Sequence, residues 1–263
     1  MLELILLLSL GLVVGTFSAL FGVGGGVLIV PLLPLAVNLS VRETIATSLF
    51  AIFLVVANNT LSFQRKKMIE WRIALQMGPM TAVGSYSAGW ATRWLSPVFL
   101  KYLLASLLLA FVVRAWLGIR DLSQAKAKNA IAAGVGVVAG MASGLSGVGS
   151  GVILSPFMMA MRLVEHTRVS PTANAIMCFT TSFGTLAFID WPEAGSPWTW
   201  GQVHGEKSFI LVLGAWVSSF FARRWQHRVP ELARRRILLT VLFLLSLKVF
   251  WDAYSLQVGT GQL

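Results

Sequence analysis

Long apolar runs alternate with short polar or basic connectors along the whole chain. The runs lie near residues 4–21, 25–38, 43–63, 72–92, 98–118, 130–146, 150–161, 169–189, 206–222 and 232–255. Most of them are long enough to cross the hydrocarbon core of a bilayer as a helix, which takes about 20 residues. The runs at 25–38 and 150–161 are too short for this, so we expect half-length or tilted helices there.

The first short run begins in a cluster of glycines, "FGVGGGVLIVPLLP" at residues 21–34. A single helix over 4–38 would extend for about 52 Å at 1.5 Å per residue, whereas the apolar thickness of a bilayer is about 30 Å. We therefore expect the chain to break between 4–21 and 25–38, with the glycines at the break.

The same pattern occurs a second time. Residues 15–32 align without a gap with residues 140–157, and nine of the 18 positions are identical. The identical pairs are Gly15/Gly140, Ser18/Ser143, Leu20/Leu145, Gly22/Gly147, Val23/Val148, Gly24/Gly149, Gly26/Gly151, Val27/Val152 and Pro31/Pro156. Weaker matches continue downstream. The sequence therefore predicts a tandem duplication, with a first membrane repeat at 1–122 and a second at 128–263.

The connectors predict how the repeats are oriented. If each of the ten runs turns the chain round, the basic connectors all lie on one side of the membrane, as the positive-inside rule requires. These connectors are 64–67, 119–129, 162–168 and 223–236. Five turns per repeat is an odd number, so the second repeat is inverted relative to the first, as in many secondary transporters. The predicted fold class is an all-α, polytopic bundle of two inverted repeats, each with a glycine-broken or re-entrant first hairpin.

Composition agrees with a membrane protein. Of the 263 residues, 56% are hydrophobic and only 12% are charged, which is too apolar for a water-soluble domain. The net charge of +11 comes largely from the connectors, so membrane orientation explains it better than nucleic-acid binding. The one cysteine, Cys178, excludes an intrachain disulfide and a cysteine metal cluster. We expect a multi-pass protein of a bacterial-type plasma membrane, surrounded by lipid, with no cofactor, metal or nucleic-acid partner and no sequence signal for an oligomeric state.

The glycine breaks predict an anion site. Inside a bilayer, non-helical backbone persists only where protein or a water-filled cavity satisfies its N–H and C=O groups. A helix that restarts after a break directs unpaired N–H groups and a positive dipole end into that cavity. Glycines in membrane helices also serve close helix packing. Because the cluster is duplicated, we expect both breaks to line one cavity at the repeat interface.

Polar side chains in the runs after each break are the other candidates for this site, because hydroxyls and amides donate hydrogen bonds to oxyanions. The alternative role of each is a hydrogen bond to a neighbouring helix. The predicted substrate-binding residues are Gly22, Gly24, Gly25, Gly26, Thr47, Ser48, Asn58, Asn59, Gly147, Gly149, Ser150, Gly151, Thr172 and Asn174.

These residues carry a family resemblance. The stretch "GLVVGTFSALFGVGGGVLIVPLLPLAVNLSVRETIATSLFAIFLVVANN", with its looser second copy "GVVAGMASGLSGVGSGVILSPFMMAMRLVEHTRVSPTANAI", resembles the TauE/SafE sulfite exporter family. The resemblance covers nearly the whole chain, and the second copy departs from the first by having Ser150 where the first has Gly25. It implies transport of small sulfur-containing anions such as sulfite, thiosulfate or sulfonates, or of related organic acids.

The polar residues and the glycine breaks bear on several functional classes. Ser143 and Ser146 lie beside glycines, but an intramembrane serine protease needs an adjacent base, and all three histidines fall in connectors, so we expect no enzyme. An exporter that works by alternating access around a midplane anion site is favoured. The alternatives are a passive anion channel and an ion-coupled uptake carrier for organic acids.

Overall fold

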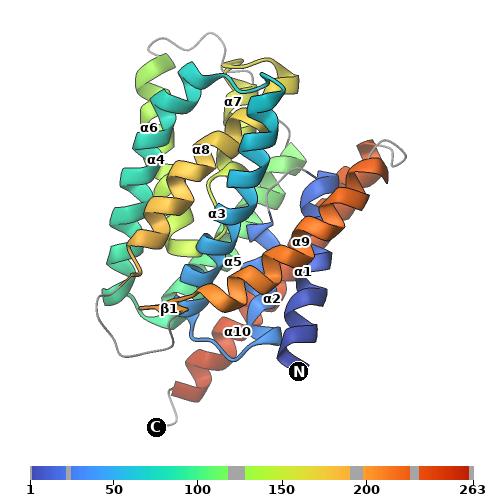
Figure 1. Cartoon of the computed structure of the whole chain (residues 1–263). Coiled ribbons are helices and arrows are strands. Elements are labelled where there is room, and N and C mark those ends of the chain that lie inside the picture. The colour runs from blue at the N-terminus through green and yellow to red at the C-terminus, as the bar shows by residue number, and fades with distance from the viewer. Residues whose placement is uncertain (1, 22–24, 118–127, 190–197, 226–230, 261–263) are drawn as a thin grey trace.

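Ten helices and one small β-hairpin form the part of the chain that the computed structural model describes, residues 2–21, 25–117, 128–189, 198–225 and 231–260 (Figure 1). The helices are α1 (Leu2–Phe21), α2 (Gly26–Ala36), α3 (Val41–Arg65), α4 (Trp71–Ala91), α5 (Pro97–Leu117), α6 (Lys128–Ser146), α7 (Gly151–Ala160), α8 (His166–Leu186), α9 (Gly205–Trp225) and α10 (Glu231–Thr260). A 3-10 turn (Thr92–Trp94) follows α4. Each of the ten apolar runs is a helix, so the all-α prediction is confirmed.

The two short runs are short helices. α2 has 11 residues and α7 has 10, so each extends for about 15 Å, roughly half of a bilayer's hydrocarbon core. α2 follows Gly25, and α7 follows Ser150. Each therefore begins inside the protein, next to its glycine cluster.

The helices pack in pairs, and in each major pair one helix comes from the first half of the chain and the other from the second half. α1 packs along α9, and α6 packs along α4, so the first helix of each half lies on the fourth helix of the other. α3 crosses α8, and α5 pairs with α10. In Figure 1, α4, α6, α7 and α8 lie on one side of the molecule and α1, α2, α9 and α10 on the other, with α3 between them.

Small residues permit the close pairings. A Cβ added to Gly15 would collide with the backbone of Ala215, and a Cβ added to Gly140 would collide with that of Thr81. Gly15 and Gly140 are equivalent in the aligned repeats, and each faces the fourth helix of the other half. Membrane helices that approach this closely use glycine because a side chain would hold the backbones apart.

Polar contacts and a small β-hairpin stabilise the start of α3. Ser40 and Glu43 form a capping box at the start of α3. The strands β1 (Thr199–Trp200) and β2 (Val203–His204) pair antiparallel, and the Nε2 of His204 lies 3.1 Å from the Oε1 of Glu43. The apolar pattern did not predict this hairpin, because two-residue strands are too short to show an alternation.

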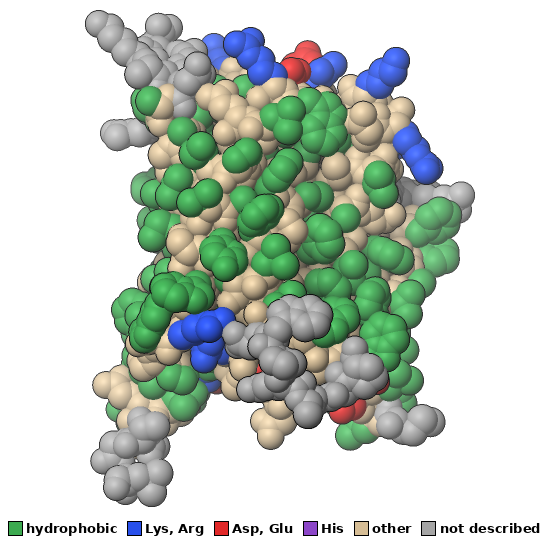
Figure 2. Space-filling model, turned by 60° about the vertical axis from the view of Figure 1, so that its left-hand side comes forward, with side chains coloured by type: hydrophobic (Ala, Val, Ile, Leu, Met, Phe, Trp, Pro, Cys, Tyr) green, Lys and Arg blue, Asp and Glu red, His purple; other side chains and the backbone are tan. Residues whose placement is uncertain are grey.

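The surface is that of a membrane protein. Large apolar side chains are exposed along the helices, for example Val83, Trp116 and Leu244. Figure 2 shows a hydrophobic belt with most Lys and Arg side chains gathered at its upper end. Among the residues that the structure describes, three helices have spans long and apolar enough to cross a membrane by length and composition, Val41–Arg65, Pro97–Arg114 and Leu239–Val258. The chain is a multi-pass integral membrane protein.

Candidate functional site

The second glycine break is a buried turn between α6 and α7. Gly147 and Gly149 have φ angles of 74° and 88°, in the left-handed region that favours glycine. The N–H of Gly147 donates to the carbonyl of Ser143 over 2.8 Å, and the N–H of Val148 donates to the Oγ of Ser146 over 3.3 Å. The chain therefore leaves α6 and re-enters a helix within four residues.

The start of α2 lies directly against the second break. A Cβ added to Gly26 would lie 2.8 Å from the carbonyl carbon of Val148, and closer still to its oxygen. Gly25, the residue before α2, is buried against Val14 of α1. The start of α2 therefore touches the turn that precedes α7, in the interior of the protein.

The first backbone N–H groups of the two short helices have no partner in the described part of the chain. The first amides with intrahelical partners are those of Leu28 and Ile29, which bond to Gly25, and those of Ile153 and Leu154, which bond to Ser150. For the earlier N–H groups of α2 and α7, no hydrogen bond to a described residue is found, and neither helix has a side-chain cap. The positive ends of two helices therefore meet at the breaks.

Two hydroxyl groups from the crossing helices reach the second break. The Oγ of Ser48 on α3 donates to the carbonyl of Gly147 over 2.9 Å. The hydroxyls of Ser150 and Thr180 on α8 share a hydrogen bond of 2.8 Å. All these side chains are fully buried. Of the predicted residues, the structure brings together Gly25, Gly26, Ser48, Gly147, Gly149, Ser150 and Gly151.

Thr47 lies away from the breaks. Its Oγ1 accepts from the N–H of His204, and its carbonyl accepts from the hydroxyl of Ser208. Thr172 accepts from the N–H of Glu70 and so supports the start of α4. Both hydroxyls therefore hold neighbouring elements together, which is the alternative role that sequence left open.

The asparagines form a separate group. The Nδ2 of Asn59 lies 3.4 Å from the Oδ1 of Asn174, which joins α3 to α8. Asn59 follows Ser48 by 11 positions, about 16 Å along a helix, so this pair is remote from the breaks. Asn58 is exposed. Gly22 and Gly24 lie outside the described residues.

Two cavities reach the second break. Cavity A, about 330 Å³, lies between α2, α3, α5 and α10, and its lining includes Ser40, Thr44, Lys101 and Ser146. Cavity B, about 430 Å³, lies between α5, α6 and α7, and its lining includes Arg114, Ser143, Ser146, Val148 and Gly149. Sequence reasoning considered Ser143 and Ser146 only as nucleophiles. The match of Ser143 with Ser18 in the duplicated motif was the signal that this segment lies beside the break.

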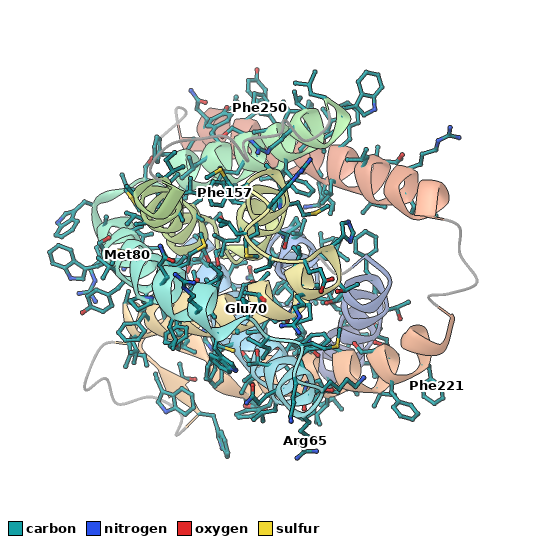
Figure 3. The ribbon with its side chains drawn as sticks, turned by 90° about the horizontal axis from the view of Figure 1, so that it is seen from above. Arg65, Glu70, Met80, Phe157, Phe221 and Phe250 are labelled. Carbon is teal, nitrogen blue, oxygen red and sulfur yellow. The ribbon has the colours of Figure 1, made fainter. Side chains whose placement is uncertain are left out.

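The view along the bundle axis shows the depth of α7. In Figure 3, Phe157 of α7 lies toward the interior, whereas Arg65, Phe221 and Phe250 lie at the rim. Phe157 is 5% exposed, against 61% for Phe221 and 56% for Phe250. The longer helices thus enclose this half-length helix. Its free backbone groups are therefore not exposed to lipid, which could not form hydrogen bonds with them.

The chain is similar to known membrane proteins over nearly its whole length. The family model described as sulfite exporter TauE/SafE matches residues 7–249. Probable membrane transporter proteins match as well: one of Methanocaldococcus jannaschii is 25% identical over 250 residues, covering 92% of this chain and 93% of that protein. One of Haemophilus influenzae is 28% identical over 258 residues, covering 92% and 93%. YunE of Bacillus subtilis is 24% identical over 276 residues, covering 94% and 97%. No solved structure matches the chain. The chain therefore belongs to the sulfite exporter TauE/SafE family and is a membrane transporter.

Proposed function

We propose that this transporter exports small sulfur-containing anions, such as sulfite, thiosulfate or organosulfonates, by alternating access, with no catalytic step. The observation that carries the proposal is the buried contact between Gly26 and the backbone of Val148, which joins the starts of two half-length helices. The sulfur-containing cargo follows the description of the family.

The chemistry at the breaks suits an oxyanion. Two helix N-termini, with N–H groups that have no partner among the described residues, favour negative charge. The hydroxyls of Ser48, Ser150 and Thr180 could donate to an anion by turning from their present acceptors. The break residues themselves contribute no carboxylate that would repel an anion. Backbone donors do not distinguish among sulfite, thiosulfate and a sulfonate, so the site suits small sulfur-containing anions as a class.

The packing provides the parts for alternating access. One apolar core joins α1, α2, α3, α5, α9 and α10 and extends to Val148 of the second break and Met177 of α8, and a second core joins α4, α6, α7 and α8. Cavities on two sides of the second break correspond to the two approaches that an alternating site needs. Rocking of the two bundles about the contact between the breaks would expose the site to each side in turn.

Export does not require a coupled ion under this proposal. For an anion that leaves a cell with a negative interior, the membrane potential contributes about 2.3 kcal/mol per charge per 100 mV in the outward direction. Flux in proteoliposomes should therefore respond to an imposed potential without a sodium or proton gradient. Strict dependence on such a gradient would favour the ion-coupled carrier, and flux that never saturates would favour a passive channel.

Variants of the breaks test the site. Gly26→Leu and Ser150→Leu should abolish saturable flux of sulfite, thiosulfate and ethanesulfonate while the protein still inserts. The first leucine would fill the contact between α2 and Val148, and the second would fill the space between Ser150 and Thr180. Gly134→Leu is the control, since a Cβ added to Gly134 meets no atom within 4 Å. Wild-type flux in both break variants would reject the site.

A further inference from the structure

Helix α5 lines both cavities and carries a cationic residue on each. Lys101 lines cavity A, and Arg114 lines cavity B. They are 13 positions apart, which is about 20 Å along a helix. The side chains of α5 that line the cavities between them are apolar, so α5 presents an apolar wall with a positive charge toward each end.

The two cavities share one residue, Ser146 of α6. Opposite it, Leu104 lines cavity A and Leu108 lines cavity B. These leucines are four positions apart, so they lie on the same face of α5. Leu104, Leu108 and Ser146 are 6%, 3% and 2% exposed. Ser146 therefore borders both cavities, and Leu104 and Leu108 lie on α5 where one cavity gives way to the other.

The walls of both cavities favour a solute that is partly apolar. Cavity A combines Ser40, Thr44, Lys101 and Asp252 with mostly aliphatic side chains. In cavity B, the hydroxyl of Ser143 is buried and has no hydrogen-bond partner among the described residues. A hydrated inorganic anion that entered these cavities would lose its water and find few hydrogen-bond donors along the walls. This loss of hydration is unfavourable. An anion with an aliphatic part would bury that part against them.

We propose that cavities A and B are the two halves of one route along α5, closed at Ser146 between Leu104 and Leu108, and that this route carries organic anions with an apolar part. The inference rests on the proposed transport of sulfur-containing anions and deepens it. Within that class, alkanesulfonates are the cargo that the route suits best. The charges of Lys101 and Arg114 attract the sulfonate at either mouth, and the unpartnered hydroxyl of Ser143 can donate to it in cavity B.

Cysteine accessibility tests the route without any transport measurement. In a Cys178→Ser background, Ser146→Cys should react with the anionic, membrane-impermeant reagent sulfonatoethyl methanethiosulfonate, and added hexanesulfonate should slow the reaction. Ser85→Cys is the matched control, because Ser85 is equally buried but lines neither cavity. An unreactive Ser146→Cys, or equal reaction at both positions, would overturn the route. Protection by phospholipid and not by hexanesulfonate would also overturn it, because cavity B would then hold a lipid chain.

A chain-length series tests the cargo. Ethane-, butane- and hexanesulfonate should compete for the protein with affinities that rise by up to about fourfold for each added methylene that becomes buried. Affinity that is independent of chain length would overturn the preference for a partly apolar anion. Leu108→Ala should give a several-fold faster leak of hexanesulfonate, because it shortens a side chain where one cavity gives way to the other. Leu109→Ala, on the exposed side of the same helix, should not; equal leaks would reject the constriction.

The proposed function and the proposed route can be rejected independently of each other. If Ser146→Cys is modified and protected while the protein moves none of these anions, the proposed function is rejected and the route stands as a binding path. If the anions are transported while Ser146→Cys stays inert, the function stands and the route is rejected.

Discussion

The close packing of α6 on α4 makes a direct prediction about stability. Gly140 of α6 faces Thr81 of α4, and a Cβ added to Gly140 would lie 2.8 Å from both the Cα and the carbonyl carbon of Thr81. Carbon atoms in favourable contact are about 3.5–4.0 Å apart. Gly140→Ala therefore forces the two helix backbones apart by roughly 0.7 Å or more, because backbone cannot swing aside as a flexible side chain can.

The expected cost follows from two opposing effects. Overpacking of this kind costs about 1–3 kcal/mol. Replacing glycine by alanine inside a helix returns up to about 1 kcal/mol. We expect Gly140→Ala to lower the free energy of unfolding by about 1–2 kcal/mol. Gly134→Ala, on the same helix with no atom within 4 Å of its added Cβ, should be neutral or stabilising by up to about 1 kcal/mol.

Thermal unfolding of the two purified variants in one detergent measures the difference. At roughly 2–4 °C per kcal/mol for chains of this size, their Tm values should differ by about 2–12 °C, with Gly140→Ala the lower. A Gly140→Ala protein that is as stable as Gly134→Ala would refute the close approach of α6 and α4. The same comparison at Gly15 would report on the equivalent pairing of α1 and α9.

Two further predictions concern orientation and the break itself. If the basic connectors face the cytoplasm, an impermeant maleimide should label Lys66→Cys only in inside-out vesicles and Ser96→Cys only in right-side-out vesicles. Both variants are made in a Cys178→Ser background. Labelling of both from one side would contradict the ten-turn topology. Ser48→Ala removes the donor to the Gly147 carbonyl and leaves that oxygen buried, so the free energy of unfolding should fall by about 1–3 kcal/mol. An unchanged unfolding midpoint would show that the hydrogen bond does not hold the break.

The sequence predicted the elements because membrane segments are encoded locally. A helix in lipid must satisfy its own backbone and needs about 20 apolar residues to cross, so run lengths alone located all ten helices. The same arithmetic showed that 25–38 and 150–161 could not cross, and α2 and α7 are indeed short. The duplicated glycine motif likewise located the end of α1 and the start of α2, and the turn between α6 and α7, where Gly147 and Gly149 have the positive φ that few other residues suit.

Which polar side chains meet the breaks depended on the tertiary structure. Thr47 and Ser48 are neighbours in sequence, yet Ser48 faces Gly147 and Thr47 faces the hairpin and α9, because adjacent positions on a helix point about 100° apart. The rotation of α3 that makes this choice is set by its packing on α8 and α9. The sequence by itself thus determined where the helices and their breaks lie and that the helices are surrounded by lipid. These features depend on the length of each apolar run and on backbone chemistry. The partners of each hydroxyl and the cavities beside Ser146 arose only when helices distant in the chain packed together.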